Sequence, residues 1–220
     1  MPTLDRHDDV FVLDLGDTEN RLHPDLITAV NGLLDEVEKA PSPAALVTTA
    51  TGKHYSLGLD LDWLVAHADQ QATYIASVQE LLARLLTLPM VTVAAMPGHV
   101  FAGGAMVSLA HDLRVMRADR GFWCLPEADI NLPFTPGMSA LIQGRLTPQT
   151  AHEAMVTARR YGGLEAAERH IIDRAVPADD VLPTAISLAQ AQAGKAGPTL
   201  ATIKTRLHPG VLQALRSNQL

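Results

Sequence analysis

The order of apolar and polar residues along the chain predicts strands that alternate with helices. Continuous apolar runs predict buried strands at 10–15, 44–49, 91–95 and 113–116. Apolar residues at helical spacing predict helices over about 24–37, 74–86 and 104–111. Because this alternation is typical of βαβ crossovers, we predict an α/β fold with largely parallel strand pairing.

The carboxy-terminal half, from about Met138 onward, is predicted to be mainly helical, with alanine-rich segments at 151–158, 164–170 and 181–193. No internal repeat, charge block or low-complexity linker divides the chain. A length of 220 residues suits one domain. We therefore predict a single domain over 1–220, with a core over about 1–137 and a helical portion over about 138–220.

The composition excludes several classes of protein. The net charge is −7, from 17 basic and 24 acidic residues, which argues against binding to nucleic acid. The single cysteine, Cys124, rules out a disulfide framework. The longest apolar segment, 85–100, is interrupted by prolines, threonines and a glycine, so no membrane span is expected. With no signal peptide visible, we expect a cytoplasmic protein.

Several common site motifs are absent from the sequence. It contains no GxGxxG or GxxxxGK[ST] phosphate loop and no GxSxG nucleophile elbow. His152-Glu153 begins like the zinc motif HExxH, but Val156 stands where the second histidine is needed. Since none of the nine histidines pairs at a ligand-like spacing, we expect no metal site.

Two glycine-containing turns each follow a predicted strand. Gly58 allows a sharp turn that can leave the N–H of Leu59 unpaired. Gly103 opens a predicted helix, where the first N–H groups have no internal acceptor and the helix dipole is positive. Two such donors would form an oxyanion hole, each worth about 3 kcal/mol to a transition state. Alternatively, both turns are only tight connections.

Glu127 is the third candidate, because it lies among apolar neighbours in the segment 122–134. Burial in such surroundings raises the pKa of a carboxyl group and suits it to proton transfer near neutral pH. The alternative is that Glu127 caps a helix or pairs with an arginine. Asp129 is a rival base, but in an extended segment only one of the two side chains would face the site.

These segments, taken in order, resemble the crotonase (enoyl-CoA hydratase/isomerase) superfamily. The resemblance rests on 20–24, the glycine turns at 53–61 and 98–112, the Pro126-Glu127 segment with Gly137, and 159–177. It implies a crotonase-like ββα spiral core and a helical carboxy-terminal portion that forms trimers. It further implies a homotrimer or a dimer of trimers.

A finer similarity, to plant-type peroxisomal 3-enoyl-CoA to 2-enoyl-CoA isomerases, is carried by 21–25, 108–112, 119–121 and 127–133. It implies that the N–H groups of Leu59 and Gly103 hold the thioester oxygen of an acyl-CoA. The residues it implies along the CoA path, mostly through backbone contacts, are Arg21, Leu22, Ser56, Leu57, Asp60 and Leu61. Further substrate contacts are expected from Gly104, Met106, Pro126 and Leu132. No cofactor is expected, since coenzyme A is part of the substrate.

One departure from the family pattern bears on the reaction. Hydratases of this family use two glutamates, and Met106 stands where the first would be. A double-bond shift needs only one group that moves a proton, so we predict an isomerase with Glu127 as its acid and base. A hydratase that uses Asp129 or an ordered water, and a non-catalytic acyl-CoA-binding subunit, are the alternatives.

Two further residues have open roles. Met106 and Phe134 are expected to line the acyl pocket, or else to be plain core. Lys204 lies where the family often carries a lysine that reaches the CoA phosphates. Its alternative role is a solvated lysine on a helix.

Overall fold

The computed structural model describes residues 1–217, so 218–220 of the predicted helical portion lie outside the described residues. Its larger sheet has the strand order β1-β2-β3-β5-β7-β9. All neighbours pair in parallel except β1 and β2. The strands are β1 (Thr3–His7), β2 (Val10–Asp14), β3 (Ala45–Thr49), β5 (Val91–Met96), β7 (Leu113–Arg117) and β9 (Arg174–Val176). The predicted α/β class and parallel pairing are confirmed.

A second, smaller sheet was missing from the sequence-based strand assignments. It contains β4 (His54–Ser56), β6 (His99–Phe101) and β8 (Trp123–Cys124) in parallel. Strands of two or three residues are too short to show a periodicity. Each follows a strand of the larger sheet, so three successive turns of the chain contribute one strand to each sheet. This is the ββα spiral that the resemblance implies.

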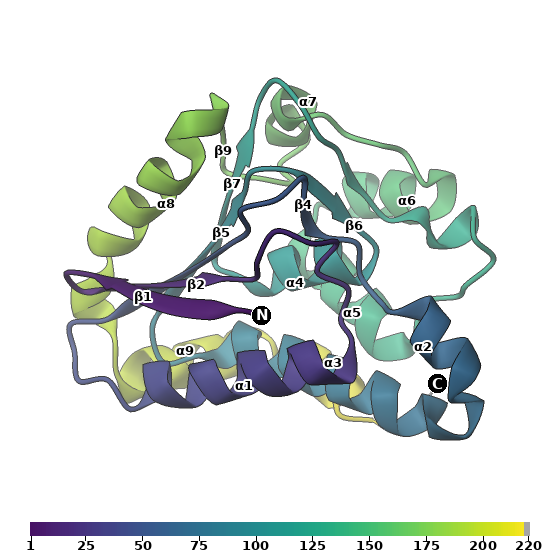
Figure 1. Cartoon of the computed structure of the whole chain (residues 1–220), viewed down its shortest axis with the longest axis horizontal. Helices are drawn as coiled ribbons and strands as arrows, with labels where there is room; N and C mark the ends of the chain where they lie inside the picture. Colours follow the sequence, from purple (N-terminus) through teal and green to yellow (C-terminus); the bar gives the residue numbers. More distant parts are fainter. Residues whose placement is uncertain (218–220) are drawn as a thin grey trace.

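Helices surround the two sheets (Figure 1). The α-helices are α1 (Pro24–Glu38), α2 (Leu61–Ala66), α3 (Gln71–Thr87), α4 (Gly103–Ala110), α5 (Pro136–Arg145), α6 (Pro148–Thr157), α7 (Gly163–Glu168), α8 (Val181–Gln190), α9 (Pro198–Leu207) and α10 (Pro209–Leu215). Short 3-10 helices occupy Ala68–Gln70, Pro126–Ala128, Ala178–Asp180 and Ala193–Lys195. Within residues 1–217, no helix has the length and apolar character that crossing a bilayer requires.

The four central strands of the larger sheet, β2, β3, β5 and β7, are buried on both faces by alternate residues, whereas the edge strands β1 and β9 are exposed or half-buried. One face packs against α8 through Val47, Val93 and Val115. The opposite face, with Leu46 and Met96, joins a larger core beneath α1, α3, α4, α5 and α10. In Figure 1, α8 lies on one side of the sheet and α1, α3 and α4 lie on the other. Burial on both faces explains why these strands are continuous apolar runs.

A buried polar network joins the elements that carry the two glycine turns. The Nδ1 atom of His111 lies 2.8 Å from the carbonyl oxygen of Val107, which only accepts, so Nδ1 carries the hydrogen. Nε2 then accepts from the hydroxyl of Thr48, 2.9 Å away. That hydroxyl in turn accepts from Tyr55, at 2.7 Å. The network therefore connects β3, β4 and the end of α4, and burial lowers the pKa of His111 to about 4.

Lys204 has neither of the roles considered for it. Its side chain is buried, and its ammonium group donates to the carboxylate of Asp112 at 2.5 Å and to the carbonyl oxygen of Met90 at 2.7 Å. The same carboxylate accepts from the backbone N–H of Thr92 at 2.8 Å. Lys204 therefore joins α9 to the larger sheet, and it is not free to reach a phosphate.

We predict that Lys204→Met lowers the free energy of unfolding by about 3 kcal/mol, because it leaves the Asp112 carboxylate without its cation in a partly buried setting. Chemical denaturation followed by circular dichroism measures the difference. The exposed Lys195 provides a matched control, and Lys195→Met should change stability by less than about 0.5 kcal/mol. Equal midpoints for Lys204→Met and the wild type would contradict the structural role.

Candidate active site

The turn after β4 leaves one backbone amide unpaired. Gly58 has a φ of +86°, and its N–H donates to the hydroxyl oxygen of Ser56 at 3.1 Å. The carbonyl oxygen of Gly58 accepts from the N–H of Leu22 at 2.7 Å. The next amide, that of Leu59, donates to no group within residues 1–217. Two hydrogen bonds of Gly58 thus fix the turn, and the N–H of Leu59 that follows is free to bind a ligand.

The second turn presents its amide at the start of α4. Ala102 has a φ of 51°, a left-handed conformation that costs a residue with a Cβ about 1–3 kcal/mol. Its N–H donates to the carbonyl oxygen of Cys124 at 3.0 Å, and its own carbonyl accepts from Met106 at 3.2 Å. Gly103, the first residue of α4, donates to no group in the described chain. The strained residue of this turn is therefore Ala102, whereas Gly103 has no positive φ.

The two turns lie against each other. A Cβ atom placed on Gly58 would be 2.4 Å from the nitrogen of Gly103. A Cβ atom on Gly103 would be 3.4 Å from the nitrogen of Leu59. Only glycine permits this approach, and it brings both free amides to one cavity.

That cavity, hereafter the Glu127 cavity, has a volume of about 200 Å³. Five of the predicted site residues line it: Leu59, Gly103, Met106, Glu127 and Leu132. Seven others complete the wall: Leu64, Gln71, Ile75, Pro133, Phe134, Thr135 and Met138. Met106 is 1% exposed, and both it and Phe134 contact the cavity, as expected of residues that line an acyl pocket.

Glu127 sits in the 3-10 helix Pro126–Ala128, directly after β8. A compact turn holds its backbone, since its carbonyl oxygen accepts from the N–H of Leu132 at 3.1 Å. The side chain is 5% exposed, and Oε2 is buried with no hydrogen-bond partner within residues 1–217. Burial raises the pKa of Glu127 to about 7, against a smaller opposing effect of a backbone hydrogen bond.

Glu127 carries the one ionisable side chain among the described residues that line this cavity. Asp129 follows the 3-10 helix with an exposed side chain. The segment is helical here, not extended, so the reason offered for choosing between the two carboxylates was wrong. The expectation that only one of them faces the site still agrees with the structure.

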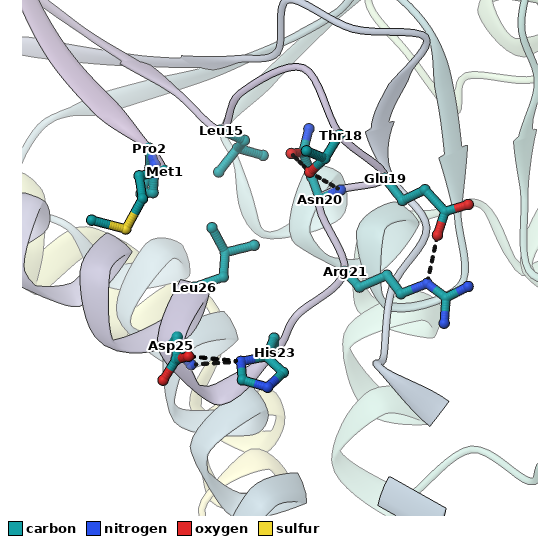
Figure 2. Close-up of a pocket in the computed structure, with 10 residues that line it drawn as sticks. All are labelled: Met1, Pro2, Leu15, Thr18, Glu19, Asn20, Arg21, His23, Asp25 and Leu26. Carbon is teal, nitrogen blue, oxygen red and sulfur yellow. Dashed lines mark hydrogen bonds and ion pairs between the residues drawn. The ribbon is translucent and has the colours of Figure 1, made fainter. Parts of the chain in front are cut away.

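The residues expected along the CoA path come from two segments, 21–22 and 56–61, that lie side by side, since the N–H of Leu22 donates to the carbonyl oxygen of Gly58. Arg21 lies at a separate cavity of about 430 Å³, together with Glu19 and His23 (Figure 2). Its guanidinium donates to Glu19 at 2.7 Å and to Asp62 at 2.8 Å. The cation therefore bridges the β2–α1 loop and α2 and is already compensated by carboxylates.

Several of the other expected contact residues build the turns. Ser56 is buried, and its hydroxyl donates to the carbonyl oxygen of Asn20 at 2.7 Å. The N–H of Leu57 donates to the carbonyl of Glu19 at 3.0 Å. A Cβ atom on Gly104 would be 2.4 Å from the carbonyl oxygen of Ser56, so Gly104 is packed against β4.

The remaining expected residues lie next to the two turns and the 3-10 helix, and none of them lines the Glu127 cavity. Leu22 is buried beside the Gly103 turn, and its carbonyl oxygen accepts from the hydroxyl of Tyr74 at 2.9 Å. Asp60 caps α2 by accepting from the N–H of Trp63 at 3.1 Å. Leu61 is exposed, and Pro126 opens the 3-10 helix that carries Glu127.

The wall formed by α2, α3 and α5 was not assigned to the site by sequence reasoning. Ile75 was assigned only to a helical apolar face, a pattern that does not separate core residues from cavity-lining ones. Thr135 caps α5, donates to the Oε1 atom of Gln79 at 2.7 Å and also faces the cavity. A threonine before Pro136 is the one signal that could have located this cap.

In the described part of the chain, no three His, Cys, Asp or Glu side chains are grouped so that they could hold a metal ion. The 3-10 helix with Glu127 and the two turns with free amides meet at the Glu127 cavity. Their arrangement can polarise a carbonyl group and move a proton beside it.

Comparisons with known proteins agree with this geometry. The model of the enoyl-CoA hydratase/isomerase family matches residues 6–219. Enoyl-CoA delta isomerase 3 of Arabidopsis thaliana is 36% identical, over 95% of this chain and 92% of that protein. The peroxisomal enoyl-CoA delta isomerase 2 of the same plant is 34% identical over the same shares. The chain belongs to the enoyl-CoA hydratase/isomerase family.

Solved structures share the whole architecture. An enoyl-CoA isomerase from Mycobacterium tuberculosis superposes with a TM-score of 0.91 at 27% identity, over 99% of this chain and 95% of that one. An enoyl-CoA hydratase from Mycobacterium marinum gives 0.89 at 27% identity, over 98% and 94%. The predicted crotonase-like fold is confirmed. Its structural relatives include proteins named as isomerases and proteins named as hydratases.

We predict that Glu127→Gln stabilises the protein at alkaline pH. The pKa of the folded-state carboxyl is raised from 4.5 to about 7, so the wild type loses stability as pH rises through this interval. The variant cannot ionise there and should be more stable by about 3 kcal/mol above the interval, with little difference below it. Denaturant unfolding across a pH series measures this.

The exposed Gln149 provides a control, because Gln149→Ala gains and loses no titrating group. Its difference from wild type should be the same at each pH. A pH-independent difference for Glu127→Gln as well would show that the carboxyl group is not destabilised by burial.

Proposed function

We propose that this protein is an enoyl-CoA isomerase that converts a 3-enoyl-CoA to a trans-2-enoyl-CoA. One observation carries the proposal: a buried carboxyl group with a pKa near 7 faces the same cavity as two unpaired backbone amides. The delta isomerases among its relatives support the same reaction.

In the proposed mechanism, the thioester oxygen accepts from the N–H groups of Leu59 and Gly103. These donors stabilise the negative charge that develops on this oxygen when a proton leaves C2. The amide of Gly103 begins α4, so the helix dipole adds partial positive charge at the same place. Both amides are held in advance by the backbone, and no reorganisation is needed during the reaction.

Glu127 performs the proton transfer in two steps. Its carboxylate takes a proton from C2, and the electron pair of the broken C–H bond is delocalised over a dienolate that extends from the thioester oxygen to C4. The carboxylic acid then delivers the proton to C4, the double bond moves to C2–C3, and the carboxylate is restored. A pKa of about 7 suits a group that accepts and returns a proton near neutral pH.

Hydration of a 2-enoyl-CoA is the second candidate, since several structural relatives are called hydratases. Hydration needs one group to activate water and another to supply a proton. Met106 lines the cavity where the resemblance implies the first of the two hydratase glutamates, and a thioether cannot transfer a proton. The site therefore favours isomerisation. A non-catalytic acyl-CoA-binding role does not need a carboxyl group that exchanges a proton near pH 7, so the raised pKa of Glu127 favours catalysis.

Coenzyme A is proposed to enter past the β2–α1 loop and the turn after β4, which are joined by the 2.7 Å bond between Leu22 and Gly58. Contacts would come from the backbone of this turn. Arg21 would have to exchange its bonds to Glu19 and Asp62 before it could bind a phosphate group.

We also propose three properties that follow from the resemblance and the composition. These are assembly as a homotrimer or a dimer of trimers, a cytoplasmic location, and activity without a cofactor. The exposed side chains of Ile203 and Leu207 on α9 support an assembly in which helices of the carboxy-terminal portion meet another copy.

We predict that Glu127→Gln lowers kcat for 3-hexenoyl-CoA by about a hundredfold to ten-thousandfold, because the amide cannot accept the C2 proton. Binding of a saturated acyl-CoA, measured by calorimetry, should change little. For the wild type, kcat/KM should rise with pH, be half-maximal near pH 7 and level off above it, since the ionised form is the base.

Crotonyl-CoA hydration, assayed beside isomerisation, separates the second candidate. Wild-type turnover that is retained in Glu127→Gln would rule out Glu127 as the base. A hydration rate that matches or exceeds isomerisation would favour the hydratase instead.

We also predict that Gly58→Ala lowers kcat by about a hundredfold to a thousandfold, because the new Cβ would displace the Gly103 amide and strain the turn. Gly194→Ala is a matched control, since nothing lies within 4 Å of the Cβ it adds. Steady-state assays, with circular dichroism to verify folding, measure both. A folded Gly58→Ala protein with normal kcat would exclude the amide pair from catalysis.

A further inference from the structure

The wall that carries Glu127 has a cavity on each side. On its inner side lies the Glu127 cavity of about 200 Å³. On its outer side lies an open groove of about 440 Å³, hereafter the outer groove. Four residues line both: Glu127, Leu132, Pro133 and Phe134. The outer groove is completed by Ala128, Asn131, Ser139 and Met155.

The segment 132–134, hereafter the strap, packs against the core through Phe134 and is hydrogen-bonded within residues 1–217 only at its two ends. At one end, the N–H of Leu132 donates to the carbonyl oxygen of Glu127 at 3.1 Å. At the other, Thr135 caps α5 by accepting from the N–H of Met138 at 3.2 Å. Between them, Pro133 has no N–H, and Phe134 makes no hydrogen bond within residues 1–217. The strap is the partition between the Glu127 cavity and the outer groove. Because so few hydrogen bonds hold it, displacing it costs little free energy.

The proposed reaction fixes where the acyl chain must run. With the thioester oxygen on the Leu59 and Gly103 amides, C2 and C4 lie next to Glu127, and every later carbon lies beyond it. A volume of about 200 Å³ is below the range of about 300–1,000 Å³ usual for pockets that enclose a whole ligand. A short acyl chain fits within the cavity, whereas a longer one has to leave it.

We propose that the acyl tail of a long-chain 3-enoyl-CoA passes beneath the strap into the outer groove, where Met155 on α6 and Ser139 on α5 form its far wall. The inference rests on the proposed function and names its substrate class: unbranched 3-enoyl-CoAs longer than the Glu127 cavity can hold. Leu132 and Phe134 then contact the chain on both sides of the strap, and the groove adds apolar contact for each further methylene group.

The test compares kcat/KM for 3-hexenoyl-, 3-decenoyl- and 3-dodecenoyl-CoA. In the wild type, kcat/KM should rise with chain length, by at most about fourfold for each methylene group that becomes buried. Met155→Trp narrows the outer groove and should lower the ratio of the dodecenoyl to the hexenoyl value at least tenfold. The neighbouring Val156 is 61% exposed and outside the groove, so Val156→Trp should leave the ratio as in the wild type.

Ser139→Trp narrows the groove from α5 and should have the same effect, which keeps the test valid if Met155→Trp does not fold. Gln71→Trp blocks the other conceivable exit, between α2 and α3. If Gln71→Trp lowers the ratio and the two groove variants do not, the tail leaves by that exit and the proposal is overturned. An absence of isomerisation with every chain length would instead refute the proposed function.

Discussion

The site depends on keeping one carboxyl group out of water while its Oε2 atom has no hydrogen-bond partner within residues 1–217. Burial raises the pKa of Glu127 from 4.5 to about 7, which corresponds to about 3 kcal/mol against the ionised form. The left-handed Ala102 costs about 1–3 kcal/mol more. Against a typical net stability of 5–15 kcal/mol, these costs are large, and the rest of the fold has to offset them.

The spiral places the site at the point where three successive turns of the chain meet. Each of the small-sheet strands β4, β6 and β8 leads directly into one site segment: the Leu59 turn, the Gly103 turn and the Glu127 helix. Neighbouring strands are joined by parallel ladder bonds, so the three segments keep a fixed spacing. The buried network from Tyr55 through Thr48 to His111 then fixes β4 relative to α4. The small sheet therefore holds the site segments in place, although its strands are too short to give a pattern in the sequence.

The sequence predicted four of the six large-sheet strands, β2, β3, β5 and β7, and most helices, because their apolar runs reflect burial on whole faces. It missed β1 and β9, which are exposed or half-buried and carry no apolar run. It also singled out Leu59, Gly103 and Glu127, which line one cavity in the structure, since glycine turns and an isolated acid are local signals. The small sheet and the far wall of the cavity could not be predicted, because contacts such as that of Thr135 with Gln79 join residues 56 positions apart. Lys204 was misassigned for the same reason, as its partner Asp112 is 92 positions away.

The residues expected to touch coenzyme A show how one sequence signal can have two physical causes. Ser56 and Gly104 match the family pattern, yet the hydroxyl of Ser56 is used by Asn20 and Gly58, and Gly104 is there because a Cβ would collide with Ser56. The hydroxyl of Ser56 and the missing Cβ of Gly104 thus position the backbone that a ligand would touch. A substitution at Ser56 would act through the Leu59 amide and so would impair the chemical step, not only binding. Motif matching alone does not make this distinction, because it depends on which atoms of the motif are already bonded.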